Sequence, residues 1–159
     1  MSRAHGVRLA LDWGLSRIGV AACDAQGVLA YPVTTITPAQ DRRHVTTALA
    51  ELVAEYEPTG ILVGLPRHLG GAEGENARMV RAWAGDLAAR FPAVAIRLVD
   101  ERLSTRSAER DLQAAGRTAS NRRGIIDQAA AVAILNAALD QERASGTLAG
   151  ELIQEAGTR

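Results

Sequence analysis

The order of hydrophobic patterns along the chain predicts an α/β protein with a mixed five-stranded sheet and helices on both of its faces. Three strand patterns come first, and two further strand patterns then alternate with helical ones. The 159 residues are 47% hydrophobic, which is enough for one domain with a buried core. We therefore place the domain in residues 1–143 and expect residues 144–159 to form a loosely ordered tail.

The first three strand patterns follow one another closely. Apolar side chains alternate with other side chains over residues 7–12 and 17–23, and a third strand pattern covers residues 28–36. Turn residues separate these segments, so they should form an antiparallel meander. Pro32 places the third strand at an edge or a bulge. Asp12 stands at the end of the first strand.

The rest of the chain alternates between helices and strands. Short apolar segments at residues 60–65 and 94–99 predict two further strands. Residues 66–74 form a Gly-rich loop, and residues 116–124 show no periodicity and should form a mobile loop. Helices are predicted in four segments: from Asp41 to Pro58, from Val80 to Phe91, from Ser104 or Thr105 to Gly116, and from Ile125 to Leu139. Three antiparallel strands followed by two strands with crossover helices are the arrangement of the ribonuclease H-like fold.

Acidic residues at three places in the chain should meet at one edge of this sheet. Asp12 ends the first strand, and Asp100 and Glu101 follow the last one. Neighbouring side chains on a strand point in opposite directions, so one of these two should face Asp12. Asp127 lies at the start of the apolar helix 125–139. A carboxylate aimed at a core costs several kcal/mol unless it is paired or bound to a metal.

Each of these positions also has a structural explanation. A single Asp at a strand end is usually a turn residue, and Arg97 and Arg102 could neutralise the acidic pair. Asp127 could stabilise the N-terminus of its helix through the helix dipole, by about 0.3 to 1 kcal/mol. Converging carboxylates repel one another, however, and a divalent cation is the usual solution. Oxygen ligands favour Mg²⁺ or Mn²⁺, and two such ions can promote hydrolysis of a phosphodiester, so the carboxylates predict a nuclease.

Four motifs carry these carboxylates and are similar, in order, to those of a known family. They are Leu11-Asp12-Trp13-Gly14 with Arg17-Ile18-Gly19-Val20-Ala21; Val63-Gly64-Leu65-Pro66 with Gly71 and Glu73-Gly74; Asp100-Glu101-Arg102-Leu103-Ser104-Thr105; and Ile126-Asp127-Gln128-Ala129-Ala130-Ala131. Over residues 7–143 the chain resembles the YqgF family, also called RuvX, whose members are described as Holliday junction resolvases and as pre-16S rRNA nucleases. It departs from the usual family pattern at Arg67-His68, where an apolar residue and Asn are usual, and at Ser104, where Thr is usual.

The resemblance implies that Asp12, Glu101 and Asp127 are catalytic carboxylates that bind Mg²⁺ or Mn²⁺. It implies a metal-dependent endonuclease that matures the 5′ end of 16S rRNA from its precursor, with ribosomal precursor particles as partners. A resolvase acting on branched DNA is one alternative, and a non-catalytic RNA-binding module is another, although such a module would not need Glu101 and Asp127. Nucleotide binding of the actin and sugar-kinase type needs two domains around a cleft, and this chain supplies one.

Basic residues between two of the acidic motifs could hold a phosphate backbone. The net charge is zero, so nucleic acid must be bound by a local patch. Arg102 and Arg106 stand four residues apart, and Arg117, Arg122 and Arg123 share a segment without acidic residues. We expect these five residues to form a clamp for phosphates, against the alternative of a solvated helix face and loop.

The sequence also indicates where the protein acts. Cys23 is the single cysteine, which excludes an internal disulfide and fits a reducing compartment. The N-terminus lacks the apolar segment of a signal peptide, and no stretch approaches about 18 consecutive apolar residues. We expect a soluble cytoplasmic protein, a monomer or homodimer, with no membrane partner.

Overall fold

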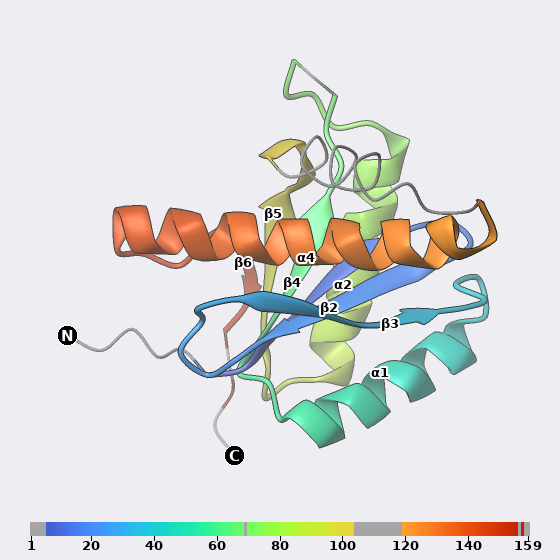
Figure 1. The fold of residues 1–159 in the computed structure, drawn as a ribbon, viewed down its shortest axis with the longest axis horizontal. Coiled ribbons are helices and arrows are strands. Elements are labelled where there is room, and N and C mark those ends of the chain that lie inside the picture. Colours follow the sequence, from blue (N-terminus) through green and yellow to red (C-terminus); the bar gives the residue numbers. More distant parts are fainter. Residues whose placement is uncertain (1–5, 69, 104–118, 156, 158–159) are drawn as a thin grey trace.

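A mixed six-stranded sheet forms the centre of the computed structural model, which describes residues 6–68, 70–103, 119–155 and 157 (Figure 1). Its strands, in their order across the sheet, are β3 (Ala30–Ile36), β2 (Ile18–Cys23), β1 (Arg8–Trp13), β4 (Gly60–Leu65), β5 (Ala95–Asp100) and β6 (Glu151–Gln154). The first three strands in the chain are antiparallel neighbours, whereas β4 runs parallel to β1 and β5 runs parallel to β4. The predicted meander and crossover strands are confirmed.

Helices cover both faces of the sheet. α1 (Arg42–Tyr56) and α2 (Glu75–Arg90) pack on one face, and α4 (Ala119–Ser145) crosses the other (Figure 1). β1 contributes alternately to the two apolar cores, since Leu9 and Leu11 pack with α1 and α2 while Ala10 packs with α4. Asp12 shares the parity of Ala10, so its side chain lies on the α4 face.

The strand count differs from the prediction, because the sheet has six strands rather than five. The sixth, β6, comes from residues 144–159, which were predicted to be a loosely ordered tail, and it pairs antiparallel with β5. An ion pair between Arg81 of α2 and Glu151, at 2.7 Å, also holds it. A half-exposed edge strand of four residues has too short a pattern to be recognised, and its pairing with β5 decides its conformation.

Helix α4 begins earlier than predicted. Residues 119–124 are helical, although they belong to the segment 116–124 that was predicted to be a mobile loop. Apolar periodicity indicates only which residues are buried. A helix gains one backbone hydrogen bond for each residue added, even when the side chains are exposed, so α4 can extend beyond its apolar pattern. The helix predicted from Ser104 or Thr105 to Gly116 lies outside the described residues.

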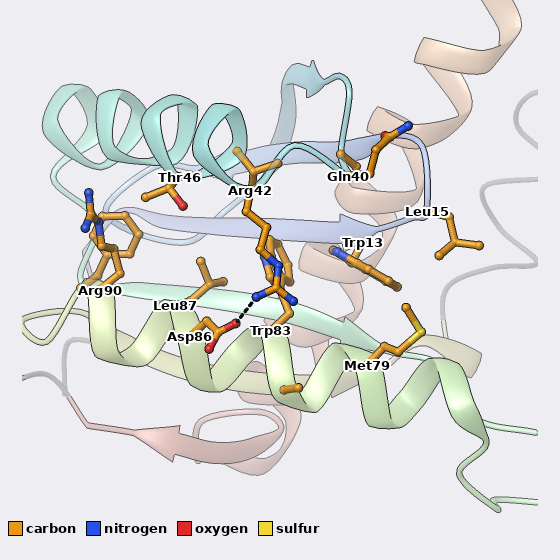
Figure 2. A pocket seen from close by; sticks show the side chains of 14 residues that line it. Trp13, Leu15, Gln40, Arg42, Thr46, Met79, Trp83, Asp86, Leu87 and Arg90 are labelled. Carbon is orange, nitrogen blue, oxygen red and sulfur yellow. Dashed lines mark ion pairs between the residues drawn. The ribbon is translucent and has the colours of Figure 1, made fainter.

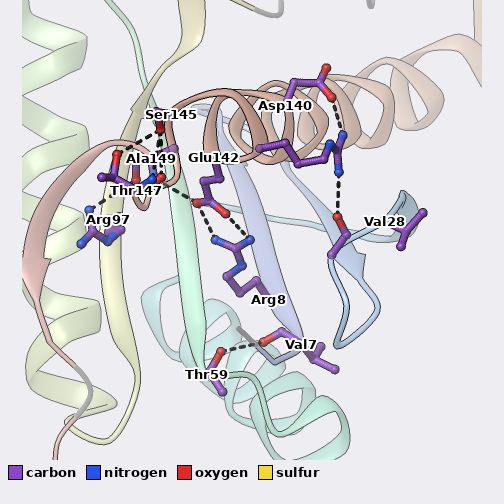
Figure 3. A network of polar contacts seen from close by, with 12 residues as sticks. Val7, Arg8, Val28, Thr59, Arg97, Asp140, Glu142, Ser145, Thr147 and Ala149 are labelled. Atoms are coloured by element: carbon purple, nitrogen blue, oxygen red, sulfur yellow. Dashed lines mark hydrogen bonds and ion pairs between the residues drawn. The ribbon is translucent and has the colours of Figure 1, made fainter. Parts of the chain in front are cut away.

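Two sets of polar contacts fix α4 on the sheet. Near its C-terminal end, the guanidinium of Arg8 donates to both carboxylate oxygens of Glu142 at 2.6 and 2.7 Å, and the Ala149 backbone N–H donates to the same carboxylate at 3.0 Å (Figure 3). Arg8 and Glu142 are both buried, so loss of either would leave an uncompensated charge. Near the other end, the Gln128 amide donates to Thr35 Oγ1 at 3.1 Å.

Strand β2 and helix α4 approach each other backbone to backbone at Gly19. A Cβ atom at this position would lie 1.9 Å from the carbonyl oxygen of Asp127, so any side chain would push the two elements apart. Gly19 is the register partner of Asp12 on β1. The close approach therefore sets how far Asp127 stands from the sheet position that carries Asp12.

We predict that Gly19→Ala destabilises the protein by at least about 1–3 kcal/mol, the usual range for an overpacked core, because the added methyl group overlaps a backbone atom. Urea denaturation would measure this change. The control is Gly85→Ala on α2, where a Cβ would meet open space and the helix should gain about 0.5–1 kcal/mol. Equal stability of Gly19→Ala and the parent protein would contradict the close approach of β2 and α4.

Candidate active site

The site is built around Asp12 at the C-terminal end of β1. Its carboxyl group is half-buried on the α4 face and shares a hydrogen bond with Glu101. Burial above all, and then the hydrogen bond with Glu101 and the negative charges of Glu101 and Asp127, raise the pKa of Asp12 to about 9. Glu101 and Asp127 therefore both act on Asp12 electrostatically.

Glu101 reaches Asp12 because β5 ends at Asp100 and the chain enters a short 3-10 helix, η1 (Glu101–Leu103). Its carboxyl group lies beside Gly64 of β4, where a Cβ would be 3.8 Å from the Glu101 carboxyl carbon and 2.6 Å from Ile134 of α4. A Cβ at Gly64 would overlap Ile134, whereas it would make an ordinary van der Waals contact with Glu101. The glycine thus lets the acidic side chain and α4 share one end of the sheet.

Asp100 points to a different partner. Its carboxylate pairs with Arg102 at 2.6 Å and also accepts the backbone N–H of Arg102 at 2.9 Å. These hydrogen bonds from Arg102 hold the pKa of Asp100 below its usual value. The expectation that one member of the Asp100-Glu101 pair faces Asp12 is confirmed, and that member is Glu101.

Asp127 is held by a residue that the sequence patterns did not indicate. Arg17, in the turn between β1 and β2, donates from Nε to Asp127 Oδ2 at 2.6 Å. Arg17 lies two residues before Gly19, which pairs with Asp12, so the predicted β1–β2 hairpin could have indicated that Arg17 lies near the carboxylates. The motif that contains Arg17 indicated the family resemblance, but it indicated no function for the Arg17 side chain.

The carboxylates come from three different elements and offer only oxygen donors, which are the ligands that Mg²⁺ and Mn²⁺ prefer. In the described part of the chain, no three acidic, His or Cys side chains are already gathered as a metal-binding group. Asp12 is turned toward Glu101, and Asp127 is turned toward Arg17. The donor chemistry fits a hard divalent cation, and Arg17 contacts only Oδ2 of Asp127.

The predicted phosphate clamp is described only in part. Arg102 is paired with Asp100, so its charge is already balanced. Arg106 and Arg117 lie outside the described residues, and Arg122 and Arg123 belong to the first turns of α4, where the backbone alone is described. The clamp therefore stays a prediction.

The Gly-rich loop 66–74 lies beside the paired Arg102. A Cβ on Gly71 would lie 3.5 Å from an Arg102 amino group. Arg81 of α2 anchors the loop through Glu73, to which it donates two hydrogen bonds of 2.7 Å. Because Arg81 also bonds Glu151 of β6, the loop and the last strand are fixed by one side chain.

The opposite face of the sheet carries an apolar groove between α1 and α2. It has a volume of about 420 Å³, and the two tryptophans of the chain, Trp13 and Trp83, meet in it with ring centroids 6.3 Å apart (Figure 2). Leu15 and Met79 line the groove and are exposed. Trp13 follows Asp12 directly but points to the other face, so this groove is separate from the carboxylates.

Comparison with known proteins places the chain in a family. A family model described as "RuvX: Holliday junction resolvase" matches residues 6–141. The chain belongs to the RuvX family. It is 47% identical to a Streptomyces avermitilis relative named "Putative pre-16S rRNA nuclease", over 97% of this chain and 98% of the relative. A Cutibacterium acnes relative of the same name is 51% identical, over 87% of this chain and 84% of the relative.

The RuvX chain also resembles solved structures. Thermus thermophilus RuvC in complex with a Holliday junction substrate aligns with a TM-score of 0.62 and 15% identity, covering 92% of this chain and 99% of RuvC. At this identity the comparison shows the fold, and the predicted ribonuclease H-like architecture is confirmed. Within the described residues, no helix combines the length and the apolar composition needed to cross a lipid bilayer.

We predict that Asp12→Asn stabilises the protein in metal-free buffer, increasingly so as the pH rises. The folded pKa of Asp12 is raised from 3.8 to about 9, so between these values the folded state binds a proton that the unfolded state has lost. The parent protein therefore loses stability with rising pH across this window, and Asn removes that loss. Urea denaturation with EDTA at about pH 5 and about pH 8 should show the gain growing by up to about 1.4 kcal/mol for each pH unit, the value for one linked proton.

The control for this measurement is Asp100→Asn. The pKa of Asp100 is lowered, so its ionised form contributes stability that is lost only as the pH falls below the usual range of an aspartate. This variant should be less stable than the parent by the same amount at both pH values. A stability gain for Asp12→Asn that is constant or shrinks with rising pH would contradict the assigned environment of Asp12.

Proposed function

We propose that this protein is a metal-dependent endonuclease that hydrolyses phosphodiester bonds in structured nucleic acid, with Asp12, Glu101 and Asp127 as its catalytic and metal-binding residues. The observation that carries the proposal is the contact of Asp12 with Glu101, with Asp127 close enough to raise the pKa of Asp12. A desolvated group of acidic side chains is costly to fold without positive charge, which suits a site built for a cation. Membership of the RuvX family supports the same activity.

The proposed substrate is the precursor of 16S rRNA, cleaved in maturation of its 5′ end. Relatives that are about half identical to this chain, over most of its length, are named for that RNA. The description of the family model favours a second substrate, a four-way DNA junction. A role in rRNA maturation would place the protein in the cytoplasm with ribosomal precursor particles.

The acidic residues of the site would bind the metal, and two glycines would keep these acids close together. Asp12, Glu101 and Asp127 would hold Mg²⁺ or Mn²⁺, in one or two ions. Such an ion supplies activation of the attacking water and stabilisation of the leaving oxygen. In the metal-free protein Asp12 holds a proton that it shares with Glu101, because burial and the neighbouring charges disfavour its ionised form. Gly64 and Gly19 keep β4, β2 and α4 close enough for the three acids to act together.

The direct test is cleavage by the purified protein of a precursor 16S rRNA fragment and of a four-way DNA junction, with Mg²⁺, with Mn²⁺ and with EDTA. We predict that Asp12→Asn, Glu101→Gln and Asp127→Asn each reduce cleavage by more than about 100-fold, since loss of outer partners of metal ligands alone typically costs 10–100-fold. Asp100→Asn should stay within about 10-fold of the parent, because Asp100 is paired with Arg102.

The outcomes separate the candidate functions. Cleavage of the junction without cleavage of the RNA would replace the proposed substrate with branched DNA. Binding of RNA without cleavage under any metal condition would mean a non-catalytic RNA-binding module. Full activity of Asp12→Asn, or an inactive Asp100→Asn beside an active Glu101→Gln, would overturn the assigned site.

The basic segment gives a separate prediction. Replacement of Arg117, Arg122 and Arg123 together by Ala should weaken RNA binding and flatten its salt dependence, by up to about 0.7 to 0.9 units of slope for each phosphate that is no longer neutralised. Turnover of bound RNA should fall less than in the carboxylate variants, because the metal site remains. An unchanged salt slope, measured by filter binding, would show that this segment is merely solvated.

A further inference from the structure

We propose that Arg17 binds a phosphate of the nucleic-acid strand at the carboxylate site, and that Asp127 orients its guanidinium for this purpose. The inference rests on the proposed function and deepens it, because it names the group that receives the substrate backbone. Among the described residues, Arg17 is a basic side chain in direct contact with a candidate catalytic carboxylate, at 2.6 Å. Its backbone, its free donors and its exposure each support this role.

The backbone of Arg17 is firmly placed. It closes the turn between β1 and β2, and its carbonyl oxygen would lie 2.6 Å from a Cβ on Gly14, so the turn folds tightly over it. The next residue, Ile18, begins β2 and is fully buried. The base of the side chain is thus held by the sheet, and the guanidinium can reorient only about its own flexible stem.

The contact with Asp127 uses one donor of the five that a guanidinium offers. Nε donates to Oδ2, whereas the two terminal amino groups lie at the other end of the planar fork. This end of an arginine can bind two phosphate oxygens at once. Among the described residues, no acceptor is found for the terminal amino groups of Arg17.

Other arginines of the protein are used differently. Arg8 places both terminal amino groups on Glu142 and is buried, and Arg81 commits Nε and both amino groups to Glu73 and Glu151. The terminal amino groups of both side chains are thus committed within the protein. The side chain of Arg17 is about as exposed as that of Arg81, at 33% against 32%, but it commits only Nε to a partner among the described residues. Asp127 is 16% exposed, so the carboxylate lies deeper than the guanidinium.

The negative charge of the site also favours a basic residue that can bind the phosphate backbone. A phosphate backbone that approaches Asp12, Glu101 and Asp127 meets negative charge, and the nearby Arg102 is already paired with Asp100. Arg17 is also paired, with Asp127, but through Nε alone, so its terminal amino groups can still receive a phosphate. Asp127 Oδ1 accepts no hydrogen bond within the described part of the chain, so Asp127 can hold Arg17 through Oδ2 and still offer an oxygen to a cation.

The test measures binding without cleavage. Fluorescence anisotropy of a fluorescein-labelled RNA hairpin with a single-stranded 5′ extension, in EDTA, would compare the parent with Arg17→Gln and Arg17→Lys. We expect Arg17→Gln to weaken binding about 10-fold and to lower the slope of log affinity on log salt by about 0.7 to 0.9, the value for one neutralised phosphate. Arg17→Lys keeps the charge and should retain the slope with a smaller loss of affinity, because it lacks the fork.

Two further variants make the result specific. Arg42→Gln removes an equally long basic side chain from α1, on the face opposite α4, where Arg42 is exposed. It should change neither affinity nor slope. Asp127→Ala removes the partner that orients Arg17 and should lower affinity, although it removes a negative charge that would otherwise repel RNA. Circular dichroism melting would verify that each variant is folded.

The results distinguish failure of this inference from failure of the proposed function. If Arg17→Gln binds RNA with the affinity and slope of the parent while the parent cleaves RNA, the ion pair is merely structural and the inference is wrong. If the parent does not cleave any substrate but Arg17→Gln lowers affinity and slope, the phosphate site stands without the nuclease. An affinity that rises in Asp127→Ala would overturn the orienting role of Asp127.

Discussion

Helix α4 lies very close to the sheet, and the arrangement of the site follows from this closeness. Small residues line the contact on both sides, among them Ala10 and Ala21 of the sheet and Ala131 and Ala138 of the helix. At Gly19 no side chain at all can be accommodated. A helix that sits this low brings its own Asp127 within electrostatic reach of Asp12, which no helix packed on large side chains could do.

The same closeness puts stability and function in opposition. Asp12 and its acidic neighbours are brought together in a desolvated site, where charge is disfavoured, and the parent fold tolerates this with a proton on Asp12 and with Arg17 on Asp127. At the far end of α4, the buried Arg8–Glu142 pair fixes the helix on the sheet (Figure 3). Such conflict between local stability and the overall fold is typical of functional sites.

The two faces of the sheet have different characters for a related reason. On the α4 face, small residues leave room for polar groups near Asp12, whereas on the α1 and α2 face larger apolar residues fill the core and leave the Trp13–Trp83 groove near the surface (Figure 2). Adjacent residues of β1 therefore serve opposite purposes. Asp12 belongs to the candidate active site, and Trp13 belongs to the packing between the helices.

Sequence patterns were sufficient for the fold class, and they indicated the acidic residues of the candidate site. Hydrophobic periodicity reports burial, so it located the meander, the crossover strands and the acids at strand and helix ends. The strand pattern left open which of Asp100 and Glu101 faces Asp12, although the family resemblance implied Glu101. The folded chain shows the contact of Glu101 with Asp12, and it also shows that Arg17 holds Asp127 and that residues 151–154 form β6. These features arise from contacts between segments far apart in the chain, and a local pattern carries no information about which distant partner a polar side chain or a short edge strand will meet.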